Sequence, residues 1–205
     1  MYPQPINTRQ QIIDAAKQEF LKKGFSGATL RTIAQNAGVT TGAFYGYFAS
    51  KEELFDAIVK QCSDFVLNSF KDAHLKFEKI ETKDKILQFD ILSEKHILEL
   101  IKYIYKNFDS FKLILCCSHN TKYENFIHQL VDIEVTTNHN FINELQDKGI
   151  KINKIDKQLE HILISGFFSS LFEIIIHDMP QDIAIDFIHG LLDFYTAGWK
   201  KLMGI

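Results

Sequence analysis

Apolar residues recur at spacings of three and four along almost the whole chain, which is the period of a helix with one buried face. The first such set is Ile12, Ile13, Ala16, Phe20 and Leu21. It predicts a helix that begins at Asn7 or Thr8, either of which can cap it, and ends at Lys23. Gly24 follows at the position where a glycine commonly ends a helix in the left-handed conformation.

Turn and capping residues divide the rest of the chain into further helical segments. The expected helices span residues 30–37, 40–45, 50–77, 83–106, 109–116, 121–148, 153–177 and 181–202. The long fourth helix begins with "SKEEL", a capping box in which Ser50 accepts from the amide of Glu53 and the Glu53 side chain reaches back. No alternating segment of strand length occurs, so the predicted fold class is all-α.

Composition is consistent with a compact helical protein. The chain has 205 residues, of which 46% are apolar and three are proline, so it can bury the core of one large or two small domains. Its longest apolar stretch, "HILISGFFSSLFEIIIH", is interrupted by serine, glycine and glutamate, and we interpret it as a buried helix with no membrane partner.

The expected location is the cytoplasm. The N-terminal "MYPQPINTRQ" lacks the basic and apolar regions of a signal peptide. Cys62, Cys116 and Cys117 lack metal-ligand spacing, and we interpret the adjacent pair as buried and inert. His119, His128 and His139 form no metal-binding motif either, so we expect solvated histidines, no metal and no cofactor.

The segment "LRTIAQNAGVTTGAFYGY" has the spacing of a helix-turn-helix. Its apolar set is Ile33, Ala34, Ala37, Val39 and Phe44. Ala34 is small where two helices would cross closely, and Gly38 stands at the turn between them. The second helix would then project and present its first residues to a DNA major groove. A helical hairpin inside a larger core is the alternative.

The projecting face has the chemistry of a DNA contact. Thr40 and Thr41 offer hydroxyls to bases, whereas Tyr45 and Tyr47 offer hydroxyls to phosphates, with Phe44 and Phe48 buried beneath them. Lys51 lies in the first turn of the next helix, where an external phosphate would offset its unfavourable position in the helix dipole. Residues 1–60 carry seven basic against five acidic side chains, and the remainder has a net charge of −5.

Residues 12–59 resemble the N-terminal domain of the TetR family of transcriptional regulators. The resemblance is carried by "IIDAAKQEFLKKGFSGATLRTIAQNAGVTTGAFYGYFASKEELFDAIV". It implies a homodimer that binds a palindromic operator in double-stranded DNA and usually represses transcription, with DNA-binding residues 1–52 and a ligand-binding and dimerisation domain 53–205. The implied DNA contacts are Thr29, Arg31, Thr40, Thr41, Gly42, Ala43, Tyr45, Tyr47 and Lys51.

The last two expected helices are apolar nearly all round, so each needs cover on more than one side. We expect them to form a four-helix interface with a second copy of the chain; the alternative is two central helices of a monomeric bundle. The expected interface residues are Leu163, Gly166, Phe167, Ser170, Ile174, Phe187, Gly190, Leu191 and Phe194.

The resemblance also implies a small-molecule inducer in the C-terminal domain. Large apolar side chains with interspersed polar groups favour an apolar or aromatic ligand, although an aromatic stripe also occurs in an ordinary core. The candidate ligand residues are Phe65, Phe89, His96, Tyr103, Phe108, Phe111, Cys117 and Phe168.

Two other functions remain open at this point. One is an enzyme built on a helical bundle, and the other is a partner-binding protein whose N-terminal domain binds protein. No nucleophile elbow, phosphate-binding loop or paired-carboxylate signature occurs in the sequence, so we expect a regulator and not an enzyme.

Overall fold

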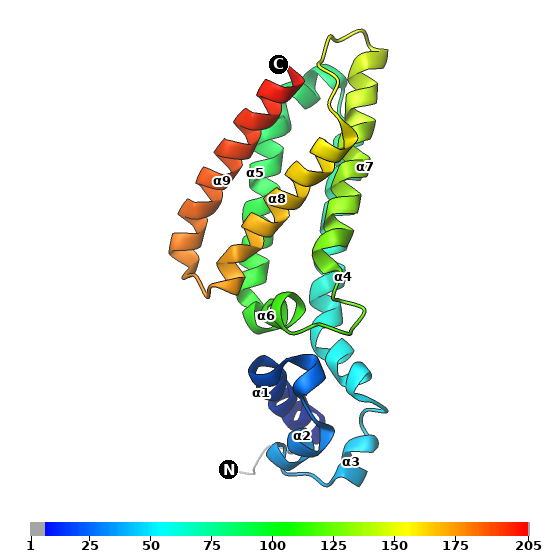
Figure 1. Ribbon diagram of the computed structural model, residues 1–205, viewed down its shortest axis with the longest axis vertical. Coiled ribbons are helices and arrows are strands. Elements are labelled where there is room, and N and C mark those ends of the chain that lie inside the picture. Colours follow the sequence, from blue (N-terminus) through cyan, green and yellow to red (C-terminus); the bar gives the residue numbers. More distant parts are fainter. Residues whose placement is uncertain (1–6, 205) are drawn as a thin grey trace. The chain divides into compact units, whose positions relative to one another are not determined.

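The computed structural model describes residues 7–204, except the side chains of residues 86–90. Within these residues the chain forms nine α-helices and no strand, which confirms the all-α prediction (Figure 1). The helices are α1 (Thr8–Gly27), α2 (Leu30–Asn36), α3 (Thr41–Tyr45), α4 (Lys51–Glu78), α5 (Thr82–Lys106), α6 (Phe108–Cys116), α7 (Phe126–Asp147), α8 (Lys157–Ile176) and α9 (Gln181–Met203).

Local capping explains the limits of the first helices. The Asn7 side chain accepts from the amide of Gln10 at 3.2 Å and so begins α1. Gly24 has φ +69° and interrupts α1, as predicted, but helical residues resume after it and continue to Gly27. The Glu53 amide donates to Ser50 Oγ at 3.1 Å, while the Glu53 carboxylate accepts from the amide of Ala49 at 2.6 Å. The predicted capping box is therefore present, with the return bond one residue earlier than expected.

Two helices start later than their sequence pattern suggested. Helix α8 begins at Lys157 instead of residue 153, because the Asp156 carboxylate accepts from the amides of Gln158 and Leu159. The preceding Asn153 instead donates its amide to Met203 O at 2.8 Å, at the end of α9. Helix α7 begins at Phe126 instead of residue 121, because residues 118–124 form turns closed by their own backbone hydrogen bonds.

The chain divides into two compact units. The first unit contains residues 7–64 and Asn107–Glu124, and the second contains Phe65–Lys106 and residues 125–204. The sequence analysis placed a boundary after residue 52, in the first turn of α4, whereas the contacts divide α4 after Asp64. They also group α6 with the first three helices, an association that helical periodicity does not reveal.

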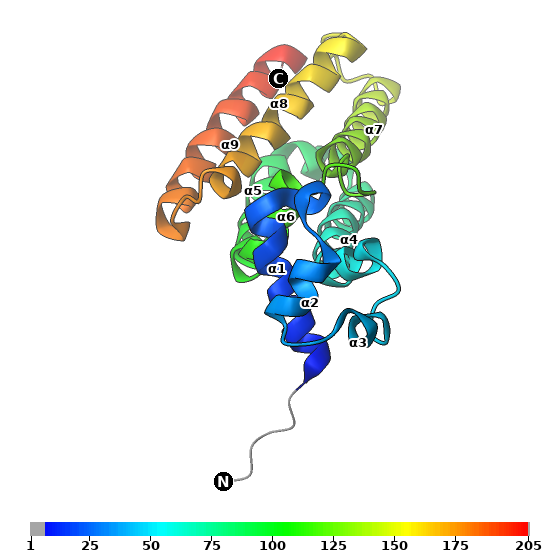
Figure 2. The ribbon, with the colours of Figure 1, turned by 60° about the horizontal axis from the view of Figure 1, so that its bottom comes forward.

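In the first unit, α2 lies between α1 and α3 in both views (Figures 1 and 2). Its core includes an aromatic cluster in which Phe20, Phe25 and Phe55 have ring centroids 5.2–5.9 Å apart. Helix α6 packs on α1, and the amide of Phe25 donates to Cys117 O at 2.9 Å just after α6 ends. The loop after α6 is thereby fixed to the end of α1.

In the second unit, α8 packs along both α7 and α9, and α9 packs on α5 (Figure 1). Among the described residues, α8 is the one helix long and apolar enough to cross a membrane by length and composition. Phe168, Leu171 and Phe172 are fully buried within the unit, so we interpret α8 as a core helix.

Most of the expected dimer residues retain exposed surface on α8 and α9. Phe194 is 73% exposed and Phe187 is 37% exposed, whereas Leu163, Gly166, Phe167, Ser170, Gly190 and Leu191 are half-buried or exposed. Ile174 was assigned wrongly to the interface, because it is completely buried inside its own unit. A helix that is apolar all round does not reveal which of its apolar residues face its own chain.

Candidate nucleic-acid interface and ligand cavity

Helices α2 and α3 are fixed by threonine caps and a glycine turn. Thr29 Oγ1 accepts from the amide of Thr32 at 3.2 Å, and Thr40 Oγ1 accepts from the amide of Ala43 at 3.1 Å. Gly38 lies between the two helices with φ +69°, a conformation that favours glycine. These local interactions set the angle at which α3 leaves α2.

The aromatic cluster around α3 divides into buried and exposed rings, as predicted. Phe44 and Phe48 are 0% and 2% exposed, and their ring centroids lie 5.9 Å apart. Tyr45 and Tyr47 are 54% and 44% exposed. Since α3 has only five residues, this buried pair of rings is what anchors it to the unit.

Eight of the nine predicted DNA contacts are exposed in the first unit. We call them the recognition surface: Thr29, Arg31, Thr40, Thr41, Gly42, Ala43, Tyr45 and Tyr47. The two capping threonines accept from backbone amides through Oγ1, and Thr29 Oγ1 also lies 2.8 Å from Thr32 Oγ1, so one of these two hydroxyls donates to the other. The surface thus offers donors and small residues that allow close approach to a polyanion.

Lys51, the ninth predicted contact, is bound within the protein. Its Nζ donates to Phe25 O at 2.8 Å and to Ala28 O at 3.1 Å, and it lies 4.4 Å from the centroid of the Phe25 ring. The two carbonyls belong to the last part of α1 and its C-cap, where a positive charge is favourable. The external phosphate invoked from the sequence is therefore not needed to explain this lysine.

Arg9 is a basic residue that the sequence analysis did not select. It is exposed in the first turn of α1, and its guanidinium lies 5.1 Å from the centroid of the Phe48 ring, just beyond α3. Nothing in the sequence indicates this proximity, because 39 positions separate the two residues. The tertiary fold adds a positive charge beside the recognition surface.

Within the first unit, an acidic residue of α4 binds the loop that follows α6. Asp56 accepts from the hydroxyl of Tyr123 and from the ammonium of Lys122. Burial opposes ionisation of Asp56, but these hydrogen bonds and the charge of Lys122 outweigh it and hold its pKa below the usual value. Burial and the same carboxylate raise the pKa of Tyr123, which keeps its phenol protonated.

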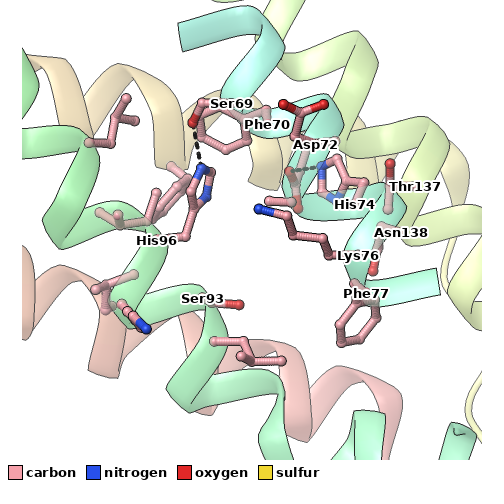
Figure 3. Close-up of a pocket in the computed structure, with 18 of the residues that line it drawn as sticks. Ser69, Phe70, Asp72, His74, Lys76, Phe77, Ser93, His96, Thr137 and Asn138 are labelled. Atoms are coloured by element: carbon pink, nitrogen blue, oxygen red, sulfur yellow. Dashed lines mark hydrogen bonds and ion pairs between the residues drawn. The ribbon is translucent and has the colours of Figure 1, made fainter. Parts of the chain in front are cut away.

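The second unit contains a cavity of about 700 Å³ between α4, α5, α7, α8 and α9 (Figure 3). This volume suits a drug-sized molecule. Its aromatic lining consists of Phe65, Phe70, Phe77, Phe141, Phe167, Tyr195 and Trp199. Sequence reasoning missed most of these residues, because helical spacing identifies an inward face without showing where the packing is incomplete.

Two imidazoles supply polar groups to the cavity wall. His96 Nε2 lies 2.6 Å from Ser69 Oγ, and His74 Nε2 lies 3.0 Å from Glu134 Oε2 (Figure 3). Burial lowers the pKa of His96, so its ring is neutral at neutral pH and acts as a hydrogen-bonding group. The cavity is therefore mostly apolar with a few polar groups that would orient a ligand.

Only part of the predicted ligand set reaches this cavity. Phe65 and His96 line it, Tyr103 stacks on Phe65 with centroids 3.7 Å apart, and Phe168 lies behind Phe70 at 5.3 Å. Three predicted residues do not line it, because they belong to the other unit: Phe108, Phe111 and Cys117. The side chain of Phe89 lies outside the described residues.

The adjacent cysteines have different environments. Cys117 is buried, and burial together with Cys116 raises the pKa of its thiol. Cys116 is exposed, so the interpretation of a buried pair was wrong for this residue. Cys116 is the last residue of α6 and Cys117 is its C-cap, so the two side chains leave the end of the helix in different directions.

Comparison with known proteins finds similarity to bacterial transcriptional regulators, mainly in the N-terminal part of the chain. Residues 12–58 match the model of a family described as bacterial regulatory proteins, tetR family. YttP of Bacillus subtilis, whose name is "Probable HTH-type transcriptional regulator YttP", is 30% identical over 131 residues, which cover 62% of this chain and 63% of YttP. The HTH-type transcriptional repressor AcnR of Corynebacterium efficiens is 37% identical over 57 residues, which cover 28% of this chain and 30% of AcnR.

The match thus spans less than two thirds of the length of these two relatives. At the level of the fold, FadR from Bacillus subtilis, solved in complex with stearoyl-CoA, gives a TM-score of 0.56 at 17% identity. The alignment covers 92% of this chain and 98% of that FadR chain. The names of these relatives describe regulators and do not favour the enzyme alternative.

Proposed function

We propose that this chain, whose residues 12–58 match the model of the tetR family of bacterial regulatory proteins, is a member of that family and acts as a cytoplasmic, DNA-binding transcriptional repressor. It binds a palindromic operator as a homodimer and is released by a small apolar or aromatic inducer. The observation that carries the proposal is the recognition surface, where polar groups are exposed around a short helix anchored by Phe44 and Phe48.

The recognition surface suits two kinds of DNA contact. Tyr45 and Tyr47 project hydroxyls that donate to phosphate oxygens and so position the protein on the duplex. Thr41 begins α3 beside Gly42, where a hydroxyl and close backbone approach favour contact with base edges. Arg9 and Arg31 add the charges that make binding sensitive to salt.

Homodimer formation is supported by apolar surface on α8 and α9. Ile162, Ile183 and Phe194 are 64%, 54% and 73% exposed. Because a soluble monomer rarely exposes so many large apolar residues on two neighbouring helices, this surface favours a partner that covers it. Pairing these helices with those of a second copy covers that surface as a four-helix bundle. Two recognition surfaces related by twofold symmetry then read a palindrome.

Induction is proposed to act through the cavity of the second unit. A ligand there contacts α4, the helix whose first residues belong to the unit that carries the recognition surface. The ligand favours a conformation in which the two recognition helices no longer match major grooves about 34–36 Å apart. The apolar lining, with neutral His96 as a hydrogen-bonding group, suits an apolar or aromatic molecule.

The test is selection of binding sites from a random pool of DNA duplexes, followed by affinity measurement at two salt concentrations. We expect a palindrome and salt-sensitive binding. Arg31→Ala should weaken binding to all duplexes. It should also reduce the slope of log affinity against log salt concentration by about one, the change expected for the loss of one phosphate contact. Thr41→Val should relax preference at one base position, at a cost of about 1–3 kcal/mol.

The control is Lys22→Met, an exposed lysine of α1 outside the recognition surface, which should leave the selected sequence unchanged. Recovery of no preferred sequence by the wild-type protein, or equal affinities of the wild-type protein and Arg31→Ala for the palindrome, would contradict the proposal. Linkage gives a further requirement: operator DNA must weaken inducer binding by the same factor by which inducer weakens operator binding.

A further inference from the structure

The eight histidines of this protein fall into three groups according to their partners. Five of the eight pair with a glutamate, at distances from 2.7 to 3.9 Å: His74, His119, His139, His177 and His189. His96 bonds to Ser69. The remaining two, His128 and His161, have no glutamate partner among the described residues and instead lie against each other.

His128 and His161 come from different helices that pack side by side, α7 and α8 (Figure 1). Their ring centroids are 5.7 Å apart, and the ring planes meet at 64° in an edge-to-face arrangement. Asp132 follows His128 by one helical turn, so both side chains project from the same face of α7. One ligand atom from each of the three residues lies within 4.8 Å of the others.

We propose that His128, Asp132 and His161 bind a divalent transition-metal ion of the Zn²⁺ type between α7 and α8. A tetrahedral Zn²⁺ with ligand bonds of about 2.0–2.1 Å separates its ligand atoms by about 3.3 Å. The observed spacing reaches this value by small rotations of exposed or half-exposed side chains. Water completes the coordination, because three protein ligands leave a position open.

The ligand chemistry defines the class of metal. Two imidazoles and one carboxylate suit zinc, nickel, copper and iron, whereas Mg²⁺ and Ca²⁺ prefer an all-oxygen set. Ser165 Oγ lies 3.5 Å from His161 Nδ1, one turn further along α8. A hydrogen bond there orients the imidazole and leaves its other nitrogen for the metal, as outer-shell partners do in metal sites.

The position of the site gives it a structural consequence. All three ligands belong to the second unit, and the ion would join the two most extensively packed helices of that unit. A metal that binds the folded pair and not the unfolded chain raises thermal stability. The site is separate from the ligand cavity, since none of its three residues lines that cavity.

Calorimetric titration of the full chain with ZnCl₂ tests this inference, and Co²⁺ absorption reports the coordination. We expect one Zn²⁺ per chain and a raised melting temperature. Loss of an outer-shell partner costs about 10–100-fold in metal affinity, so His161→Ala and Asp132→Asn, which remove ligands, should each cost at least about a hundredfold. Both positions lie at the surface of the helices, and a helical circular dichroism spectrum verifies that the variants fold.

The matched control is His177→Ala, which removes an exposed histidine just beyond the end of α8 that pairs with Glu173 at 2.7 Å. Zinc affinity should be unchanged in this variant. Three results would overturn the inference: no saturable zinc binding at micromolar concentration, binding that His161→Ala leaves intact, or an equal loss in His177→Ala.

Discussion

At the scale of single residues, neighbours in the sequence have opposite roles because the helix turns them to different sides. Phe44 is completely buried and Tyr45, the next residue, is more than half exposed. For a tyrosine, the exposure of the side chain indicates the role of its hydroxyl. A buried phenol needs a hydrogen-bond partner inside the protein, whereas an exposed phenol is available to a ligand. Tyr123 illustrates the first case, because it is buried and donates to Asp56.

Asp56→Asn should lower the free energy of unfolding by about 1 kcal/mol at pH 7, a modest value because the carboxylate is partly exposed. The pKa of Asp56 is lowered in the folded state from its ordinary value of 3.8. Its contribution is therefore present above pH 3.8 and is lost as the pH falls through the lowered pKa.

Urea unfolding of the wild-type protein and this variant as a function of pH measures the effect. The difference between them should shrink as the solution is acidified below the ordinary pKa of aspartate. Tyr123→Phe keeps the carboxylate and its Lys122 partner, so it should show a smaller loss at pH 7. A difference for Asp56→Asn that is constant with pH would contradict the assignment.

At the scale of elements, short helices depend on their neighbours for stability. Helix α3 has five residues, too few to be stable alone, and it persists because Thr40 caps it and Phe44 anchors it. Helices α1 and α4 are joined by Lys51, whose ammonium bonds to carbonyls at the end of α1 from the first residue of α4. This lysine therefore orients elements on either side of the recognition surface.

Lys51→Met should reduce the free energy of unfolding by about 1–2 kcal/mol, because two carbonyls lose a charged donor. Thermal unfolding measures the change in the absence of DNA. Lys22→Met, which removes an exposed lysine from α1, should have little effect on stability. If Lys51 served only as a phosphate contact, its substitution would change DNA affinity and leave unfolding unaltered.

At the scale of the whole molecule, two features point to assembly on DNA. The first 60 residues have a small net positive charge, and the rest of the chain is acidic. Phosphate attraction is therefore concentrated near the recognition surface. The exposed apolar residues of α8 and α9 lie in the other unit, where they are available for pairing with a second copy.

Phe194→Asp should convert the dimer to a monomer, because a charge would be buried where an apolar contact is expected. Sedimentation equilibrium measures the mass, and operator affinity should fall with the loss of the second recognition surface. Ile91→Asp, on α5, is the control: Ile91 is 67% exposed and lies outside the proposed interface, so the mass should not change. A wild-type protein that sediments as a monomer at micromolar concentration would contradict the dimer.

The sequence by itself determined the helical class, the approximate helices, the helix-turn-helix and the division of rings between Phe44 and Tyr45. These features depend on period, caps and turn residues, all of which act over a few neighbouring positions. It did not determine the starts of α7 and α8, where turns and a cap at Asp156 interrupt the helical pattern.

Only the tertiary structure decided which distant groups meet. Phe108 and Phe111 lie in the first unit, whereas the cavity lies in the second. Ile174 is buried within its own unit, and Lys51 donates to a carbonyl near the end of α1. Packing also brought His161 to His128, a pair that spacing within one helix does not reveal. The physical reason is that periodicity specifies an inward face of a helix, whereas the identity of its neighbour depends on how all the helices pack together.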